Sequence, residues 1–477
     1  MKDNKETLIL GAGPAGLAAA FELHKAGRSL TIIEKNREIG GLSRTFQYGG
    51  FHTDVGPHRF FSQNQYLYGL IGDLLGDRWR KVNRLTRFYI NGRFLRYPIE
   101  LKNALLQVGI LRAAKIILDY FFQRIKKLFL RIHPVSFEEQ IISDFGESLA
   151  RLNMLNYTEK VWGLPCSRIS PDWARQRIKG LSLKEVIKNA LIKSKSKPKT
   201  LVDQFYYPDT GTGLIYEKIK ERILSNLATN ELVVKTKSFP IKIIHDNTKI
   251  VEVCIDNEGK NEFYQPENVI SSVPITELVN LLDPCPPDEI LEAARHLRFR
   301  SHISVFITLN KLEVFKDQWI YFPDKEIPFG RIMEPKNFSL KMSPHGKSSL
   351  LIEFFCWEND LIWNSSKEVL IELCMPWLEK LSFINSKEII ESFLHKEKYA
   401  YPVYDLEYKE WLGKIKGYLR RLENLQLIGR GGCFMYNNQD HALEMGILSA
   451  RNIIENKHQD IEEIGAAQVY FEQGYAR

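Results

Sequence analysis

The sequence lacks several features that indicate particular classes of protein. It has six cysteines in 477 residues, with no CxxC pair and no metal-ligand spacing, so we expect neither a disulfide framework nor a metal site. No run of roughly 18 apolar residues is free of charges, so the sequence predicts no transmembrane helix. No signal peptide, internal repeat or low-complexity tract is recognisable. These absences favour a reduced, cytoplasmic, globular protein.

A strong excess of charge of one sign is also absent. The formal net charge is +8 at pH 7, and 44% of the residues are hydrophobic, which is an ordinary composition for two or three folded domains. No DNA- or RNA-binding motif accompanies the mild positive excess, so we expect no nucleic-acid partner. A basic cleft attracts phosphates, and the charge is therefore compatible with an anionic ligand.

The N-terminal residues carry a dinucleotide-binding fingerprint. A buried strand leads into the turn GAGPAG, which opens an Ala/Leu-rich helix, and a second strand ends at Glu34. Gly11 permits the tight turn, Gly13 lets the backbone approach a pyrophosphate, and Gly16 lets helix and strand pack closely. We expect the pyrophosphate at the positive helix N-terminus and the ribose hydroxyls at the Glu34 carboxylate.

Hydrophobic periodicity divides the rest of the chain into strand-rich and helix-rich parts. Asn91-Gly92 between two strand-like runs predicts a β-hairpin over residues 85–99, and the pattern is helical from about residue 101 to 195. The other elements that we expect are strands within 231–273, 299–310, 318–323, 349–356 and 425–429, and helices over 212–228, 366–381, 386–394 and 443–455.

Residues 105–132 form a basic, amphipathic stretch, with Leu, Ile and Phe on one face and Lys and Arg beside them. The simpler interpretation is a pair of helices within a helical subdomain. The alternative is a helix that lies on a membrane surface, for which this composition is typical. Under that alternative, the protein makes weak peripheral contact with the inner face of the membrane.

Glycine-rich turns near both ends of the chain, each beside a hydrophobic strand, predict a discontinuous nucleotide-binding domain. The expected fold is α/β, with a Rossmann-like nucleotide-binding domain, which the family resemblance described below makes an FAD-binding domain, an inserted helical subdomain and an inserted, mostly antiparallel β-sheet domain, which the same resemblance assigns to the substrate. The predicted bounds are 1–84, 200–290 and 410–477 for the first domain, 101–199 for the helical subdomain, and 85–100 with 291–409 for the sheet domain.

The stretch GGCFMYNNQDHALEMG begins at Gly431 and places a row of polar residues before the last helix. Its glycines let the backbone approach a ligand closely. We interpret Asp440 and His441 as the N-terminal cap of that helix, because an acid at a helix start satisfies unpaired N–H groups.

A family resemblance rests on two further segments. KNREIGGLSRTF follows Glu34 directly, and GRGGCFMY…DHALEMGILSARNI reads as a turn and helix that return to the cofactor. Together with the fingerprint, they resemble the FAD-binding family of amine oxidases, protoporphyrinogen oxidases, phytoene desaturases and UDP-galactopyranose mutases. The resemblance implies FAD as the cofactor. It implies cofactor contacts for Gly11, Gly13, Ala15, Gly16, Glu34, Lys35, Gly41, Leu42, Arg44, Gly56, His58, Arg430 and Gly446.

Other segments, in matching order, resemble the UDP-galactopyranose mutases, with eukaryotic-type motifs at the C-terminal end. These segments are DVGPHRFFS, YTEKVWG with DWARQR, WIYFPDKEIPFGR, YPVYD and NQDH. The resemblance implies that Arg177 and Arg331 grip a diphosphate, and guanidinium groups suit that role because they form charge-assisted hydrogen bonds. The substrate-binding residues implied are Trp162, Arg177, Tyr321, Arg331, Tyr401, Tyr436 and Asn438.

The activity that this resemblance implies is that of an FAD-dependent nucleotide-sugar mutase. Such an enzyme interconverts pyranose and furanose forms of UDP-galactose or a related UDP-sugar for cell-surface polysaccharide biosynthesis. The implied mechanism is attack by N5 of reduced flavin on the anomeric carbon, with no net redox change. His58, Arg177 and Arg331 are the implied catalytic residues, with His58 shaping the flavin environment. NAD(P)H is a candidate reductant, and a nucleotide-diphosphate sugar is the expected partner.

The sequence departs from the mutase pattern in three places. Glu100 stands where the early hairpin motif has glutamine, and an acid there repels a diphosphate unless a cation intervenes. The segment between Tyr436 and Asn438 is shorter, and a substrate-contacting asparagine has no clear counterpart near Val202. Two alternatives therefore stay open. One is an amine oxidase- or protoporphyrinogen oxidase-like oxidoreductase or desaturase with an apolar substrate, and the other is a non-catalytic flavin-fold scaffold.

Overall fold

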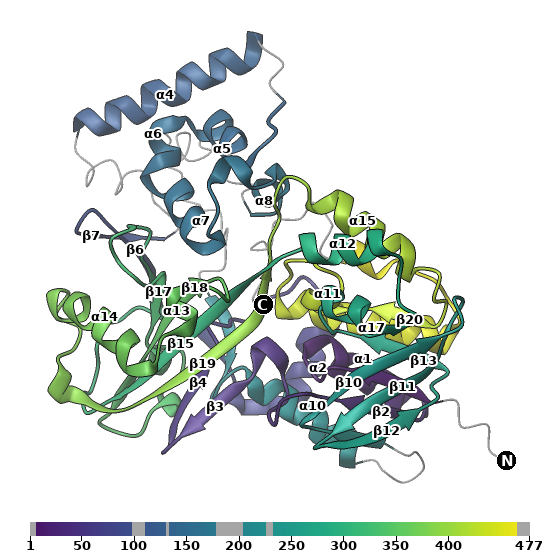
Figure 1. The fold of residues 1–477 in the computed structure, drawn as a ribbon. Helices are drawn as coiled ribbons and strands as arrows, with labels where there is room; N and C mark the ends of the chain where they lie inside the picture. Colours follow the sequence, from purple (N-terminus) through teal and green to yellow (C-terminus); the bar gives the residue numbers. More distant parts are fainter. Residues whose placement is uncertain (1–5, 98–109, 130–132, 178–203, 226–231, 465–477) are drawn as a thin grey trace.

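The computed structural model describes residues 6–97, 110–129, 133–177, 204–225 and 232–464. Figure 1 shows three parts: a parallel sheet with its helices, a larger and mostly antiparallel sheet, and a cluster of helices at one end of the molecule. The predicted α/β fold is confirmed. The predictions at Glu100, at Val202 and for the helical pattern after residue 177 lie outside the described residues.

The five-stranded sheet is parallel, and its strands come from both ends and the middle of the chain. Strands β1 and β2 are fully buried, as expected for a parallel sheet covered by helices. Helix α1 packs against both α10 and α17. In spatial order, the strands are β20 (Leu425–Leu427), β13 (Asn268–Ser271), β1 (Thr7–Leu10), β2 (Leu30–Ile33) and β9 (Leu232–Lys235), and the helices are α1 (Pro14–Lys25), α10 (Gly213–Ser225) and α17 (Gln439–Glu455).

Two glycines let the backbone of α1 pack directly against the backbones of α17 and of the turn before α1. A Cβ atom on Gly446 would lie 2.0 Å from the carbonyl oxygen of Ala15, and one on Gly16 would lie 1.9 Å from that of Gly11. Both distances are far below a non-bonded contact, so no larger residue fits at either position. The C-terminal helix is therefore held directly against the helix that follows the fingerprint turn.

Smaller elements surround this sheet. A four-stranded sheet contains β12 (Lys260–Tyr264), β11 (Ile250–Asn257), β10 (Ser238–His245) and β14 (Leu282–Asp283). Two-stranded sheets pair β3 (Thr45–Tyr48) with β4 (Phe51–Asp54), and β5 (Trp79–Asn83) with β8 (Gln204–Pro208). The helices are α2 (Gln65–Leu75), α11 (Ile275–Asn280), α12 (Asp288–His296), α15 (Tyr408–Leu419) and α16 (Gly429–Gly432).

The seven-stranded sheet forms the second part. All of its pairings are antiparallel except that of β16 with β6. Its order is β19 (Ile389–Pro402), β15 (Phe299–Leu309), β18 (Ser348–Cys356), β17 (Arg331–Met333), β16 (Trp319–Tyr321), β6 (Thr86–Ile90) and β7 (Arg93–Arg96). Every residue of β15 is buried, and α14 (Lys367–Lys380) packs against β15 and β19, with α13 (Leu361–Asn364) against β18.

Strand β19 shows that one prediction was wrong. The sequence favours a helix over 386–394, whereas a 3₁₀ turn (Ser386–Glu388) leads directly into the strand at Ile389. The segment IIESFLHKEKYAYP pairs with β15 along most of its length. Pairing with a fully buried neighbour therefore outweighs the helix propensity of its Glu and Lys residues.

Other local predictions are confirmed. Strands β6 and β7 form the predicted hairpin, and both turn residues have positive φ, 50° at Asn91 and 79° at Gly92. Helices α10 and α14 lie where helices were predicted, but the last helix begins at Gln439, before the predicted residue 443. The helical part contains α4 (Ile110–Phe129), α5 (Phe137–Phe145), α6 (Glu147–Leu149), a π-helical turn (Ala150–Met154), α7 (Leu155–Trp162) and α8 (Pro171–Arg177). The bounds of the three domains stay a prediction.

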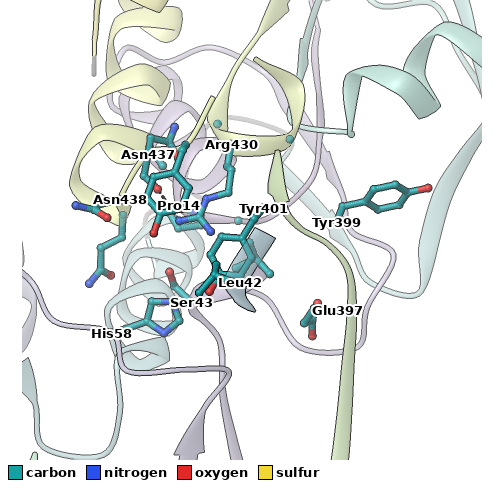
Figure 2. Close-up of a pocket in the computed structure, with 18 of the residues that line it drawn as sticks. Pro14, Leu42, Ser43, His58, Glu397, Tyr399, Tyr401, Arg430, Asn437 and Asn438 are labelled. Atoms are coloured by element: carbon teal, nitrogen blue, oxygen red, sulfur yellow. Dashed lines mark hydrogen bonds between the residues drawn. The ribbon is translucent and has the colours of Figure 1, made fainter. Parts of the chain in front are cut away.

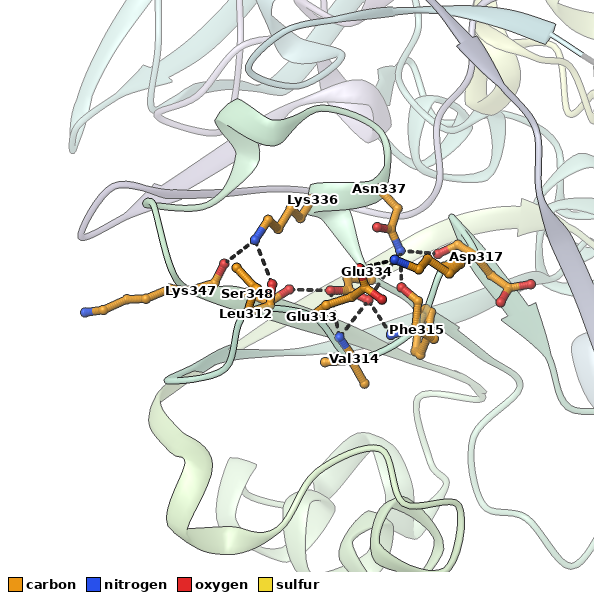
Figure 3. Close-up of polar contacts among 11 residues, drawn as sticks. Leu312, Glu313, Val314, Phe315, Asp317, Glu334, Lys336, Asn337, Lys347 and Ser348 are labelled. Atoms are coloured by element: carbon orange, nitrogen blue, oxygen red, sulfur yellow. Dashed lines mark hydrogen bonds and ion pairs between the residues drawn. The ribbon is translucent and has the colours of Figure 1, made fainter.

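A buried carboxylate fixes one end of the seven-stranded sheet. Glu334 is fully buried directly after β17, and it accepts hydrogen bonds from the backbone N–H groups of Val314 (3.1 Å) and Phe315 (2.8 Å). Ser348 and Asn337 also donate to it, as Figure 3 shows. One side chain thus joins the loop before β16, the end of β17 and the start of β18.

Replacing Glu334 by alanine should strongly destabilise this part of the protein. The change leaves the buried N–H group of Phe315, the partly buried N–H group of Val314 and a buried serine hydroxyl without their acceptor, at a cost of about 3 kcal/mol or more. We expect a thermal unfolding midpoint several degrees lower. Glu313→Ala is the matched control, because the contact that Glu313 makes with the described residues is a surface ion pair with Lys316, and its loss should change the midpoint little. Equal midpoints for the two variants would contradict the role given to Glu334.

Candidate active site

One cavity of about 1080 Å³ is lined by residues from all three parts of the molecule. It extends from the fingerprint turn before α1 to the side chains of the helical part. Figure 2 shows the middle of this cavity, where side chains from distant segments face each other. Of the residues predicted from the sequence, those that line it are Gly11, Gly13, Ala15, Glu34, Lys35, Gly41, Leu42, Arg44, His58, Trp162, Tyr321, Arg331, Tyr401, Arg430, Tyr436 and Asn438.

Four predicted residues have other positions. Gly16 and Gly446 do not line the cavity and instead hold α1 against its neighbours. Gly56 also lies outside the lining, and a Cβ atom there would come within 2.8 Å of Glu353 Oε1. Arg177 ends α8, and its side chain lies outside the described residues.

The glycine turns shape one end of the cavity. Gly11 has φ of 107°, and a Cβ atom there would lie 2.1 Å from the hydroxyl of Ser272. A Cβ atom on Gly41 would lie 3.1 Å from Cα of Gly13, so the two glycine-rich segments lie close against each other. Such a cradle beside a helix N-terminus suits a pyrophosphate, because backbone N–H groups can approach the ligand closely.

Glu34 lies at the same end with a fixed orientation. Its side chain is buried, and its carboxylate accepts hydrogen bonds from the backbone N–H groups of Ala12 (2.8 Å) and Asn36 (2.9 Å). Two backbone donors hold the acid at the cavity wall. This position fits the predicted contact with ribose hydroxyls.

Arg44 forms a buried ion pair that the sequence did not reveal. Its guanidinium donates to the Glu397 carboxylate on β19 and to the carbonyl oxygen of Gly41 (2.7 Å). Burial raises the pKa of Glu397, and the Arg44 cation opposes that shift. The pair links the second glycine turn to the seven-stranded sheet and removes net positive charge from this wall.

His58 is held as a neutral imidazole. Its Nδ1 lies 2.9 Å from the carbonyl oxygen of Gly56, which can only accept, so Nδ1 carries the proton and Nε2 is left as an acceptor. Burial lowers the pKa of His58 to about 4, and the nearby Arg430 cation acts in the same direction. His58 is therefore uncharged at neutral pH. It offers Nε2 as a hydrogen-bond acceptor to a ligand and contributes no positive charge to the cavity.

Arg331 is bound by a buried acid. Its Nη2 lies 2.7 Å from Oε1 of Glu353, and its Nε also donates to that carboxylate, while His302 contacts Oε1 from the other side (2.8 Å). Burial alone would raise the pKa of Glu353, but the Arg331 cation and these hydrogen bonds lower it to about 2. Arg331 Nη1 makes no hydrogen bond to a described residue, and it is the part of the guanidinium left for a ligand.

A stack of aromatic rings covers Arg430. The rings of Tyr401 and Tyr436 are parallel, with centroids 5.8 Å apart, and the guanidinium lies 5.3 Å and 4.9 Å from them. Arg430 also donates to the carbonyl oxygens of Ala400 (2.9 Å) and Asn437 (2.6 Å), so its position is fixed. Burial raises the pKa of Tyr401 to about 12, which keeps its hydroxyl protonated as a hydrogen-bond donor.

Other aromatic residues complete the wall. Trp162 is 2% exposed and meets Trp173 edge-on at 4.7 Å. Tyr321 stacks on Phe88 at 4.7 Å and meets Tyr157 edge-on at 5.2 Å. These rings give the cavity flat apolar surfaces with tyrosine hydroxyls among them, an arrangement suited to a sugar or another ring-shaped ligand.

The interpretation of Asp440 and His441 as the start of the last helix is confirmed, and His441 takes part in its cap, but the N-cap residue itself is Asn438. Asn438 occupies the N-cap position of α17, and His441 Nδ1 accepts from the Asn438 backbone N–H (3.4 Å). Asp440 lies within the first turn and pairs with His441. Asn438 therefore both begins the helix and lines the cavity.

Several lining or supporting residues were missed in the sequence. Glu353 was signalled only as a single acid within the apolar run SSLLIEFFC, and Glu397 lay just after the segment 386–394 that was interpreted as helix. Arg59, beside His58, also lines the cavity, with its guanidinium 5.0 Å from the ring of Phe61. At the far end, the lining is apolar and includes Ile116, Phe137, Phe145, Leu149 and Leu152.

Comparisons with known proteins agree on the fold. The crystal structure of a reduced UDP-galactopyranose mutase matches with a TM-score of 0.82 at 23% identity, over 98% of this chain and 99% of that chain. A wild-type putrescine oxidase bound to putrescine matches with a TM-score of 0.60 at 18% identity, over 94% of this chain and 99% of that chain. At these identities, the likeness establishes the fold alone.

Curated relatives match shorter stretches. The 1-hydroxycarotenoid 3,4-desaturase of Flavobacterium sp. (strain P99-3) is 43% identical over 103 residues, which are 21% of each chain. A protein from Klebsiella pneumoniae described as a probable UDP-galactopyranose mutase is 27% identical over 184 residues, 35% of this chain and 43% of its own length. The alignments thus cover less than half of these relatives.

The family itself is defined by a longer match. The model of the family described as flavin containing amine oxidoreductase matches residues 14–454, from the fingerprint turn to the end of α17. This range includes Gly41 of the glycine cradle, Glu34, the aromatic wall and the C-terminal turn. The chain belongs to the flavin containing amine oxidoreductase family.

Proposed function

We propose that this protein is an FAD-dependent mutase that interconverts pyranose and furanose forms of a nucleotide-diphosphate sugar, with UDP-galactose or a relative as substrate. The main observation behind the proposal is that one cavity is lined by the glycine cradle and by four possible ligand-binding side chains, Arg331, Tyr321, Tyr401 and Tyr436. The overall match to a UDP-galactopyranose mutase structure supports it.

The residues present fit FAD. The facing glycine turns around Gly13 and Gly41 would hold the pyrophosphate, and Glu34 would bind a ribose. Arg430, fixed by two carbonyl oxygens, and neutral His58 would lie further along the cavity. When bound and reduced, FAD supplies nucleophilic chemistry at the anomeric carbon.

The chain's own residues would bind and stabilise the leaving diphosphate. Arg331 Nη1 is available as a donor, and the hydroxyl of Tyr401 stays protonated because burial raises its pKa to about 12. Such preorganised donors stabilise charge that develops when the anomeric bond breaks. The aromatic wall around Tyr321 excludes water from the sugar and keeps its ring in place.

A second candidate is an FAD-dependent oxidoreductase or desaturase with an apolar substrate. It is favoured by the apolar far end of the cavity, where Phe137, Phe145 and Leu149 form the lining. The 43% identity to a carotenoid desaturase over part of the chain supports it as well. Under this candidate, Arg331 and its acid would be structural.

An assay with reduced enzyme tests the proposed function. We expect dithionite-reduced protein to interconvert UDP-galactopyranose and UDP-galactofuranose, measured by chromatography, and the oxidised protein to be inactive. UDP should also perturb the spectrum of bound flavin, because its diphosphate would lie within the same cavity. Absence of both effects, with consumption of an apolar polyene instead, would contradict the proposal and favour the second candidate.

Glu353→Gln should tighten the binding of UDP. The amide keeps the shape of the side chain but leaves the buried Arg331 charge uncompensated, at a cost of about 3–5 kcal/mol in stability. In variant protein that stays folded with flavin bound, a nearby diphosphate should bind about tenfold more tightly, because it supplies the missing negative charge. The affinity difference should be constant between about pH 5 and 9, because the lowered Glu353 pKa keeps the wild-type carboxylate ionised there. Titration with UDP, followed by flavin absorbance, measures it.

The matched control for that experiment is Glu334→Gln. Glu334 is a buried acid of the same sheet that does not line the cavity, so its amide should leave UDP affinity unchanged. If Glu353→Gln leaves the UDP affinity unchanged or weakens it while flavin stays bound, no diphosphate lies beside Arg331.

Removal of Arg331 is best tested together with Glu353. Arg331→Ala alone strands a buried carboxylate, at a cost of about 3–5 kcal/mol, and would confuse binding with stability. In Arg331→Met/Glu353→Gln, the charge is removed on both sides, so the protein should keep its fold and its flavin absorbance. UDP should bind at least about tenfold more weakly than to the wild type. Loss of flavin with unchanged UDP affinity would instead assign Arg331 to the cofactor site.

A further inference from the structure

Helix α4 has two faces of opposite character. On one face, Ile116 and Tyr120 are buried, at 6% and 4% exposed, and Asp119 accepts a hydrogen bond from the Ser148 backbone N–H (3.2 Å). This face packs on α5 and α6. The other face carries large apolar side chains in the open: Leu118, Phe121, Phe122, Ile125 and Phe129, which are 69%, 52%, 66%, 53% and 82% exposed.

These exposed side chains form one continuous stripe. At about 100° of rotation per residue, all five fall within a sector roughly 100° wide. The same geometry places Lys115 and Lys126 along one edge of the stripe and Arg124 along the other, and all three are exposed. The helix contains five basic residues and one acid, Asp119, which lies on the packed face. The outward surface of α4 is therefore apolar along its centre and basic along both edges.

The position of α4 leaves this surface accessible. Figure 1 shows α4 as the outermost helix at the helical end of the molecule, away from both large sheets. In the part of the chain that the structure describes, no element covers the stripe. Large exposed apolar patches on folded proteins commonly mark sites that bind another protein or a membrane.

We propose that α4 docks in the surface of an anionic lipid bilayer, with its apolar stripe among the acyl chains and Lys115, Lys126 and Arg124 on lipid phosphates. An apolar helical face rich in Phe and Leu, flanked by Lys and Arg, is the composition of helices that lie in the bilayer interface. Within the described residues, no helix has the length and hydrophobicity to cross a bilayer. The basic residues beside the apolar stripe fit a helix that lies along the bilayer surface.

The flanking charges decide against a second copy of the chain as the occupant. Two identical stripes packed together would bring Lys115, Lys126 and Arg124 of one copy close to the same residues of the other, because a symmetric contact uses the same patch twice. Like charges at that distance repel, whereas lipid phosphates neutralise them. An anionic bilayer thus complements both the apolar and the basic part of this surface.

Docking would also place the cavity close to the lipid. Ile116, on the packed face of the same helix, lines the apolar end of the cavity together with Phe137 and Phe145. A helix is about 10–12 Å in diameter, so only one helix would separate the apolar end of the cavity from the bilayer surface.

Co-sedimentation of the flavin-loaded, full-length protein with vesicles tests the proposal. The wild type should bind vesicles of phosphatidylglycerol and phosphatidylcholine, bind pure phosphatidylcholine much less, and be released by salt. Phe121→Ser/Phe122→Ser/Phe129→Ser should lower the partition coefficient at least about tenfold, because the acyl-chain contacts are lost. Lys115→Glu/Lys126→Glu should lower it by a similar factor on anionic vesicles only.

Controls keep the result specific to α4. Phe263→Ser/Leu340→Ser/Leu361→Ser removes three equally exposed apolar side chains, at 63%, 77% and 87%, from other surfaces and should leave binding unchanged. All these changes are at exposed positions, so flavin content and the thermal midpoint should match the wild type. The proposal is overturned if the wild type does not bind anionic vesicles, or if the α4 variants bind them as well as the wild type does. A wild-type dimer that the serine substitutions in α4 abolish would assign the stripe to a second copy and also overturn it.

Discussion

The close contact of α1 with α17 is the constraint on which the site depends. Gly446 allows the two helices to meet at backbone distance, and Gly16 does the same for α1 and the turn before it. As a result, the fingerprint turn near the start of the chain and the GGCFMYNN segment near its end line one cavity. The seven-stranded sheet and the helical part form the remaining walls of the cavity, with Tyr321 from the sheet and Trp162 from the helical part.

Buried acids set the electrostatics of this cavity. Arg331 is paired with Glu353, and Arg44 with Glu397, so neither arginine contributes a full net charge to its wall. A ligand there would be recognised by directed donors, such as Arg331 Nη1 and the tyrosine hydroxyls, more than by bulk charge. Arg430 is held differently, by two carbonyl oxygens and two stacked rings. His58 stays neutral because burial lowers its pKa, and the Arg430 cation adds to that shift.

Features encoded by neighbouring residues were predictable from the sequence. The turn at Gly11 and Gly13 and the hairpin at Asn91-Gly92 follow from local backbone requirements, and the structure has both. The family resemblance brought Tyr401 and Tyr436 into one site, although they are far apart in the chain. The strand at 389–402 was not predictable, because its pairing with buried β15 opposes local helix propensity. The Arg331–Glu353 pair depends on the register of β17 against β18, and the Arg44–Glu397 pair depends on the packing of the second glycine turn against β19. No local pattern in the sequence encodes either contact.

The central claim is that the cavity breaks and remakes the bond between an anomeric carbon and a diphosphate. Positional isotope exchange tests it most directly, with UDP-galactose labelled by ¹⁸O in the bridge between the sugar and the diphosphate. With the reduced protein, the account predicts that the label spreads into the non-bridging oxygens of the β-phosphate, as measured by ³¹P NMR. If the label stays in the bridge while flavin remains bound and reduced, the anomeric bond is intact and the account is wrong.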